Sequence, residues 1–148
     1  MSYKDKQIDI INKINPFLSR RHEILIAYLY GSYAKGTPRS SSDIDVAIYL
    51  KHRVDDNQYP YGYRAEIITS LIKLLGTNKI DLIILNDVPT FLKFQVIRYG
   101  TLIFTRSEAK RIEFHAGTIA KYLDVKYLLA IQHKFMSKRL ADGTFGKR

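Results

Sequence analysis

One stretch near the start of the chain constrains the fold most, because it places a short polar turn between two runs of strand-forming residues. Residues 23–30 are almost continuously apolar and predict a buried strand. Gly31 and Ser32 follow directly. After ten more residues, Asp43-Ile44-Asp45 begins a second apolar run that ends at Leu50. The pattern predicts two neighbouring strands whose polar groups collect around one turn.

The two aspartates of this stretch predict a cation site. Side chains alternate along a strand, so Asp43 and Asp45 share a face while Ile44 takes the other. Two like charges this close are unfavourable unless a cation lies between them. Mg²⁺ prefers carboxylate, water and phosphate oxygens. The Gly31 backbone and the Ser32 hydroxyl offer hydrogen bonds to phosphate, so a metal-bound nucleotide is the predicted ligand.

Two other phosphate-binding motifs do not fit the same residues. Gly31 and Gly36 have the glycine spacing of a P-loop, but Thr37-Pro38 occupies the position that requires Lys-Ser or Lys-Thr. A G-x-G-x-x-G sequence, which would indicate dinucleotide binding, follows none of the candidate strands.

The same residues carry a family resemblance. Gly31-Ser32, ten residues and Asp43-x-Asp45 resemble the signature of the nucleotidyltransferase superfamily of the DNA polymerase β type. The resemblance runs from about residue 20 to residue 130, and it implies an α/β fold: a small mixed sheet flanked by helices, with a long C-terminal helix. It also implies catalysis with ATP as substrate and Mg²⁺ bound by the aspartates. A turn with two solvated aspartates is the simpler alternative.

A third acid, Asp81, interrupts the apolar run of residues 80–85. An ionised carboxylate inside a sheet is costly unless it is paired or binds a metal. The resemblance implies that Asp81 joins Asp43 and Asp45 as a catalytic residue and metal ligand, with two Mg²⁺ ions in the site. The alternative is an acid at a strand end that faces water.

Three residues of the connecting loop are weaker candidates for nucleotide binding. Lys35 and Arg39 are cations within reach of triphosphate oxygens, and Ser42 adds a hydroxyl. The family often has arginine at the position of Lys35. Solvated loop side chains explain all three equally well.

Length and composition favour one domain in a reducing compartment. The chain has 148 residues and no cysteine, which excludes a disulfide scaffold and fits the cytoplasm. We expect a single domain over 1–148, with a core at about 20–105 and a helical extension at about 107–138. Apolar periodicity predicts helices over residues 5–20, 63–75, 89–99 and 107–136, and strands over 79–85 and 101–105. No apolar segment reaches the roughly twenty residues of a membrane helix.

The long C-terminal helix predicts a partner. One apolar stripe contains Ile112, Ala116, Ile119, Leu123, Tyr127 and Ala130, and a second contains Phe114, Val125, Leu129 and Met136, with Tyr122 nearby. One stripe can cover the sheet, and the other requires a second copy or another protein, unless both belong to one wide core-facing surface. Residues 106–148 carry ten Lys and Arg against four Asp and Glu. This charge suits an acidic partner or nucleic acid, although a solvated helix face explains it too.

The chain has no room for the template-gripping domains of a polymerase, and it resembles the minimal nucleotidyltransferases (MNT) of prokaryotes. Members of this group often act as antitoxins beside a HEPN-family RNase toxin. The resemblance implies transfer of AMP from ATP to a toxin tyrosine. HEPN nucleases have four to six residues between Arg and His, whereas Arg111 and His115 are separated by three, so the chain is not the toxin. Two alternatives remain: modification of a small molecule of the aminoglycoside kind, and an antitoxin that acts by binding alone.

Overall fold

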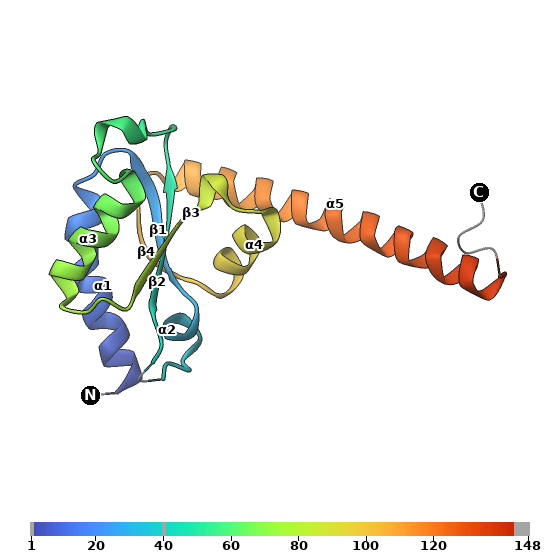
Figure 1. Ribbon diagram of the computed structural model, residues 1–148, viewed down its shortest axis with the longest axis horizontal. Helices are drawn as coiled ribbons and strands as arrows, with labels where there is room; N and C mark the ends of the chain where they lie inside the picture. The colour runs from blue at the N-terminus through green and yellow to red at the C-terminus, as the bar shows by residue number, and fades with distance from the viewer. Residues whose placement is uncertain (1, 40, 144–148) are drawn as a thin grey trace.

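The fold is built on one four-stranded mixed sheet, seen in a computed structural model that describes residues 2–39 and 41–143 (Figure 1). Its strands are β1 (Ile24–Tyr30), β2 (Ile44–Leu50), β3 (Ile80–Ile84) and β4 (Thr101–Thr105), in the order β3-β2-β1-β4. β1 runs antiparallel to both β2 and β4, and β2 runs parallel to β3. The predicted α/β class and mixed sheet are confirmed.

Two helices cover one face of the sheet. They are α1 (Tyr3–Ser19) and α3 (Tyr63–Leu75). α1 presents Ile14 and Leu18 to the core, and α3 presents Ile67 and Leu71, all fully buried. The helical spacing of these residues explains why both helices form here, since each aligns its apolar side chains along one stripe.

The opposite face carries α2 (Ser32–Lys35), α4 (Thr90–Tyr99) and α5 (Glu108–Ala141). Tyr28, Ala47, Val96 and Phe114 form the core between this layer and the sheet. Asp45 lies two residues before Ala47 on β2, and alternation along the strand gives both residues this face. The helices of this layer therefore border the candidate site.

Several elements differ from the prediction in detail. α1 begins at Tyr3 and continues through Pro16, although a proline at this position removes one N–H···O=C hydrogen bond from the helix. The turn after β1 contains the one-turn helix α2, and short 3₁₀ helices occupy residues 56–58 and 85–87. Ser107 is the N-cap of α5 and accepts a hydrogen bond from the Lys110 N–H. α5 continues to Ala141, beyond its predicted end at residue 136, and residues 144–148 lie outside the described residues.

α5 is 34 residues long and leads away from the sheet after its first turns (Figure 1). Of the two predicted stripes, the one containing Phe114 packs on the sheet only at its start, where Phe114 is 8% exposed, and its later members Val125 and Leu129 are exposed. The other stripe is exposed on Ile112 and Leu123. No helix within residues 2–39 and 41–143 has the length and apolar character needed to cross a membrane.

Candidate active site

The turn between β1 and α2 brings the backbone against a carboxylate. Gly31 has φ of 72°, a left-handed conformation that favours glycine. A Cβ atom at Gly31 would lie 2.2 Å from Oδ2 of Asp45. The Gly31 carbonyl accepts hydrogen bonds from the N–H groups of Ala34 and Lys35, which begins α2. The first N–H groups of a helix lack intrahelical partners, so this turn can donate to phosphate oxygens next to Asp45.

Three neighbouring strands bring two acids and a tyrosine into register. Asp45 pairs with Asp81 across the parallel β2 and β3, and with Tyr30 across the antiparallel β1 and β2. Residues paired across strands point to the same face of a sheet. Asp43 lies just before β2 and is exposed, whereas Asp45 is half-buried.

The electrostatics of Asp45 reflect these neighbours. Burial and, to a smaller extent, the charges of Asp81 and Asp43 together raise the pKa of Asp45 to about 6. Burial also raises the pKa of Tyr30, with further contributions from Asp45 and Asp81. The aspartates therefore create a negative potential that a cation would relieve.

An arginine already neutralises part of this charge. Nη2 of Arg64, in the first turn of α3, lies 2.7 Å from Oδ1 of Asp81. Its Nε donates to the carbonyl of Leu82, also at 2.7 Å. In the part of the chain that the structure describes, no three His, Cys, Asp or Glu side chains are grouped to hold a metal ion. The structure thus places Asp45 and Asp81 on adjacent strands without joining all three acids in one ligand group.

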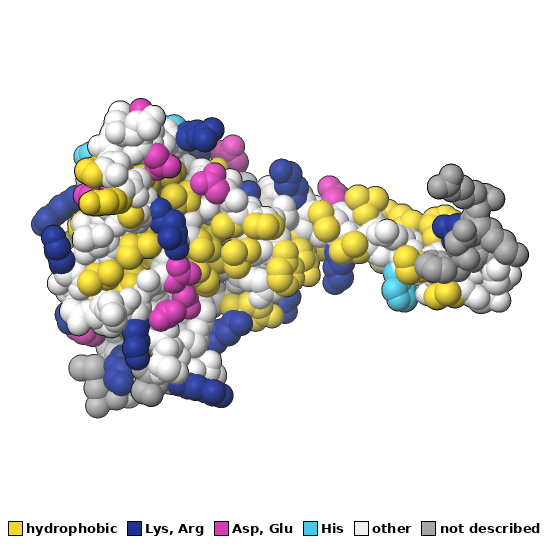
Figure 2. Space-filling model, in the orientation of Figure 1, with side chains coloured by type: hydrophobic (Ala, Val, Ile, Leu, Met, Phe, Trp, Pro, Cys, Tyr) yellow, Lys and Arg dark blue, Asp and Glu magenta, His cyan; other side chains and the backbone are white. Residues whose placement is uncertain are grey.

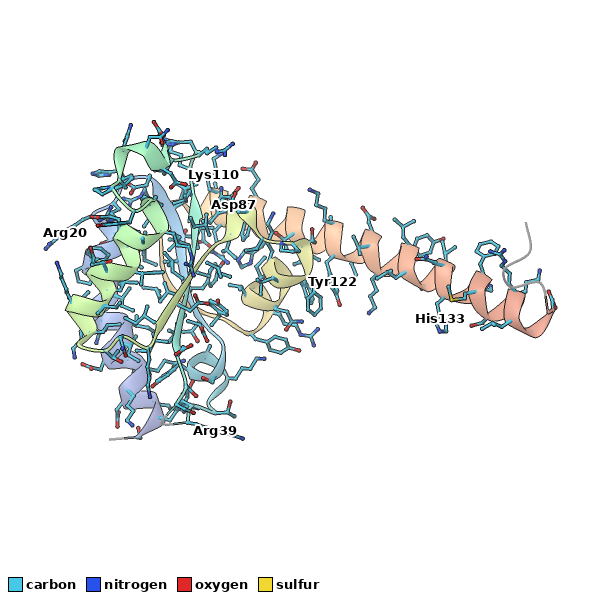
Figure 3. All side chains as sticks on the ribbon, in the orientation of Figure 1. Arg20, Arg39, Asp87, Lys110, Tyr122 and His133 are labelled. Atoms are coloured by element: carbon cyan, nitrogen blue, oxygen red, sulfur yellow. The ribbon has the colours of Figure 1, made fainter. Side chains whose placement is uncertain are left out.

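The predicted phosphate-binding side chains lie in two places: Ser32 and Lys35 in α2, and Arg39 and Ser42 in the loop that follows. Ser32 begins α2 beside the turn, and Lys35 ends that helix. Nζ of Lys35 lies 5.3 Å from the ring centroid of Tyr99, at the end of α4, in a cation–π contact. The Ser42 hydroxyl accepts a 2.7 Å hydrogen bond from the Arg39 N–H, so its oxygen holds the loop together. The Arg39 side chain points away from the sheet (Figure 3).

Sequence reasoning missed three residues at this site: Tyr30, Arg64 and Tyr99. The sequence predicts Tyr30 only as the last residue of a strand. Its pairing with Asp45 depends on the antiparallel alignment of β1 and β2. Arg64 and Tyr99 come from other elements, and the sequence contains no signal for their contacts.

A cavity of about 550 Å³ lies elsewhere, between the far end of β2, the start of α4 and the first turns of α5. Four lysines line it: Lys51, Lys93, Lys110 and Lys121. None of the predicted site residues lines this cavity. Figure 2 shows acidic side chains gathered over the sheet, bordered by hydrophobic side chains that lead toward α4 and α5. We therefore place the candidate site at the open acidic surface.

Comparison with known proteins identifies the family of the chain. The family model "Polymerase beta, Nucleotidyltransferase" matches residues 12–109. A Methanocaldococcus jannaschii protein, provisionally named a protein adenylyltransferase, is 36% identical over 76 residues, which cover 51% of this chain and 71% of that protein. The protein adenylyltransferase MntA of Shewanella oneidensis is 29% identical over 100 residues, covering 68% of this chain and 67% of MntA.

Solved structures extend the similarity to most of the chain. A chain in the crystal structure of a toxin–antitoxin with AMP-PNP has a TM-score of 0.69 and 28% identity, covering 85% of this chain and 98% of that chain. A chain in the structure of the tri-AMPylated S. oneidensis HEPN toxin in complex with MNT antitoxin has a TM-score of 0.65 and 26% identity, covering 88% and 98%. With its Gly-Ser turn placed against Asp45, this chain belongs to the polymerase β nucleotidyltransferase family.

Proposed function

We propose that this protein transfers AMP from ATP to a tyrosine hydroxyl of a HEPN-family toxin, and so acts as an adenylylating antitoxin. The observation that carries the proposal is the contact between the Gly31 turn and Asp45, with Asp81 in register on the next strand. The names of the similar proteins support the reaction, since MntA is a protein adenylyltransferase and the similar complex contains an AMPylated HEPN toxin.

The site residues fit a divalent ion and a triphosphate. Carboxylate oxygens are the ligands that Mg²⁺ prefers, and Asp43 and Asp45 supply them next to the phosphate-binding turn. Burial, followed by the charges of Asp81 and Asp43, raises the pKa of Asp45, and a bound Mg²⁺ would favour the ionised carboxylate instead. When bound, one or two Mg²⁺ ions supply charge neutralisation and alignment of the reacting oxygens. Gly31 and Ser32 would hold the β- and γ-phosphates, with Lys35 as a mobile cation beside them.

The transfer exchanges one phosphorus–oxygen bond for another. The acceptor oxygen bonds to the α-phosphorus, the bond from the α-phosphorus to the bridging oxygen breaks, and pyrophosphate leaves. Asp81, in register with Asp45 on the next strand, would take the proton of the acceptor hydroxyl. To do so it must leave Arg64, and the exposure of both side chains permits this exchange, at 53% for Arg64 and 44% for Asp81. Most of the rate enhancement would come from positioning and charge stabilisation.

The proposal is tested with ATP labelled at the α-phosphate, Mg²⁺ and a HEPN-family protein, which is first sought in the genes that neighbour this one. We expect label on the HEPN protein, and its loss in Asp45→Asn. Asp87→Asn is the matched control, because Asp87 is an exposed acid at the end of β3, outside the site (Figure 3). Label on a small hydroxylated compound instead would indicate a small-molecule enzyme. Neutralisation of the toxin by Asp45→Asn without any label would indicate an antitoxin that acts by binding alone.

A further inference from the structure

The outer half of α5 is an unpartnered helical arm. We define the arm as residues 123–141, the part of α5 beyond Tyr122, whose ring stacks on Phe94 of α4 with centroids 3.8 Å apart. Every residue of the arm except Ile131 is exposed. An isolated helix of this length is only marginally stable in water, because helices in proteins owe most of their stability to tertiary packing. The arm therefore requires a surface to pack on.

Most of the large apolar side chains of the arm lie on one face, whereas Leu123 and Tyr127 lie on the other. The exposed fractions of the larger group range from 45% to 63%, and its members are Val125, Leu128, Leu129, Phe135, Met136 and Leu140. The spacings of three, four and seven residues keep these side chains together at 3.6 residues per turn. A contiguous exposed apolar surface of this kind marks an interaction site.

This apolar face continues the buried side of α5. Phe114 and Thr118 are buried against the domain, and Tyr122 follows four residues later against α4. Val125 and Leu129 extend the same stripe at helical spacing. Figure 1 shows α5 running on past the domain, and Figure 3 shows Tyr122 and His133 on the same side of the helix as α4. A protein packed on the arm would thus lie next to α4, in the layer that borders the candidate active site.

The charge of the arm indicates whether its partner is a second copy of this chain or a different protein. The arm carries four basic residues, Lys126, Lys134, Lys138 and Arg139, against one acid, Asp124. The whole chain has a formal charge of +10. Pairing two copies would bring like charges together, whereas a partner with carboxylates around an apolar surface would be attracted.

We infer that the arm docks the acceptor protein of the proposed reaction, through an apolar helical surface on that protein bordered by acidic residues. This inference rests on the proposed function for the identity of the acceptor. The similar structures are consistent with it, because the matches cover 85% and 88% of this chain and belong to toxin–antitoxin complexes. The arm would hold the acceptor while its hydroxyl reaches the nucleotide.

The test measures binding without ATP, by titration calorimetry with the full-length chain and the HEPN-family protein used in the transfer assay. We expect Leu129→Gln/Met136→Gln to raise Kd about tenfold or more, as loss of an apolar anchor does. Glutamine has a helix propensity close to those of leucine and methionine, so the arm stays helical. Tyr127→Gln is the matched control: Tyr127 is 67% exposed but lies half a turn away, and its Kd should stay within about twofold.

A second variant tests the charge, and sedimentation tests self-association. Lys126→Glu/Lys134→Glu should weaken binding, with a smaller effect at high salt because screening already removes the attraction. An unchanged Kd in Leu129→Gln/Met136→Gln overturns the inference, and so does a wild-type dimer that this variant converts to monomers. The binding assay and the AMP-transfer assay can fail independently. If Leu129→Gln/Met136→Gln weakens binding but the wild type transfers no label, the docking surface stands and the proposed reaction is rejected.

Discussion

The backbone at Gly31 and the carboxylate of Asp45 lie so close that a Cβ atom at Gly31 would meet Oδ2 at 2.2 Å. The contact joins the turn expected to bind phosphate to the acid expected to hold the cation. A side chain at Gly31 must therefore displace Asp45, the backbone turn, or both. The two halves of the sequence motif act as one structural unit.

The contact predicts that Gly31→Ala abolishes activity. We expect a loss of at least about 100-fold in the rate of AMP transfer, because displacement of catalytic groups by about 1 Å costs that much. Gly76→Ala is the matched control, since Gly76 has φ of 70° and nothing within 4 Å of its ideal Cβ position. Both variants pay about 1 kcal/mol of backbone strain, measurable by urea unfolding. Equal activities in the two variants would show that the approach to Asp45 is unimportant.

The raised pKa of Asp45 predicts a stability gain on neutralisation. Because the folded-state pKa is about 6, above the ordinary value of 3.8, the native state binds the proton more tightly than the unfolded chain does. The associated stability is fully present below pH 3.8 and is lost as the pH rises through about 6. Asp45→Asn should therefore raise Tm at pH 7.5 without Mg²⁺, by about 2–4 °C after allowing for solvent screening. The gain should disappear near pH 4, which differential scanning calorimetry can follow.

The same pKa predicts how Mg²⁺ binding depends on pH. A carboxylate must be ionised to bind the ion, so protons compete with Mg²⁺ as the pH falls through about 6. We expect the rise in Tm caused by Mg²⁺ and ATP to shrink between pH 7.5 and pH 5. Asp87→Asn should show the same shrinkage as the wild type. If the rise in Tm caused by Mg²⁺ and ATP stayed constant from pH 7.5 to pH 5, Asp45 would not be a ligand of the ion.

Arg64 should compete with the cation for Asp81. Its guanidinium lies 2.7 Å from the carboxylate, and removing that positive charge makes the site more negative. Arg64→Gln should therefore lower the Mg²⁺ concentration that gives half-maximal transfer, by about two- to fivefold for an exposed ion pair. Initial rates over a Mg²⁺ series measure the effect. A higher Mg²⁺ requirement would instead show that Arg64 positions Asp81 for binding.

Arg106 should stabilise the fold without touching the site. Its guanidinium donates to the carbonyls of Ser19, Arg21 and Ile24, which fastens the loop between α1 and β1 to the end of β4. Lysine cannot reproduce this fork, so Arg106→Lys should lower the free energy of unfolding by about 2 kcal/mol. Arg20→Lys, at an exposed position, is the control. Urea unfolding of the two variants should differ, while their transfer rates stay equal once both are folded.

Much of the fold follows from local sequence patterns. The strands β1 and β4 and the helix α3 were predicted within a residue, because apolar runs end at Gly31, Gly76 and Gly100. The parallel pairing of β2 and β3 places Asp81 beside Asp45, which the acid inside an apolar run had suggested. The catalytic and metal-binding roles of the three aspartates remain predictions.

The features that sequence patterns missed depend on contacts between distant elements. The ion pair of Arg64 with Asp81 joins a helix to a strand, and the contact of Lys35 with Tyr99 joins α2 to α4. Neither has a local signature, since exposed cations occur throughout the chain. The two stripes of α5 were visible in the sequence. Only the structure shows that one stripe packs on the sheet and then continues, uncovered, along the arm.

The most direct test of the proposed function is the intact mass of the HEPN-family protein after incubation with this chain, ATP and Mg²⁺. The account predicts a mass increase of one or more AMP groups, located on tyrosine by fragmentation. The increase should vanish with Asp45→Asn and persist with Asp87→Asn. An unchanged mass, with toxin activity still suppressed, would contradict the account and identify binding alone as the mode of neutralisation.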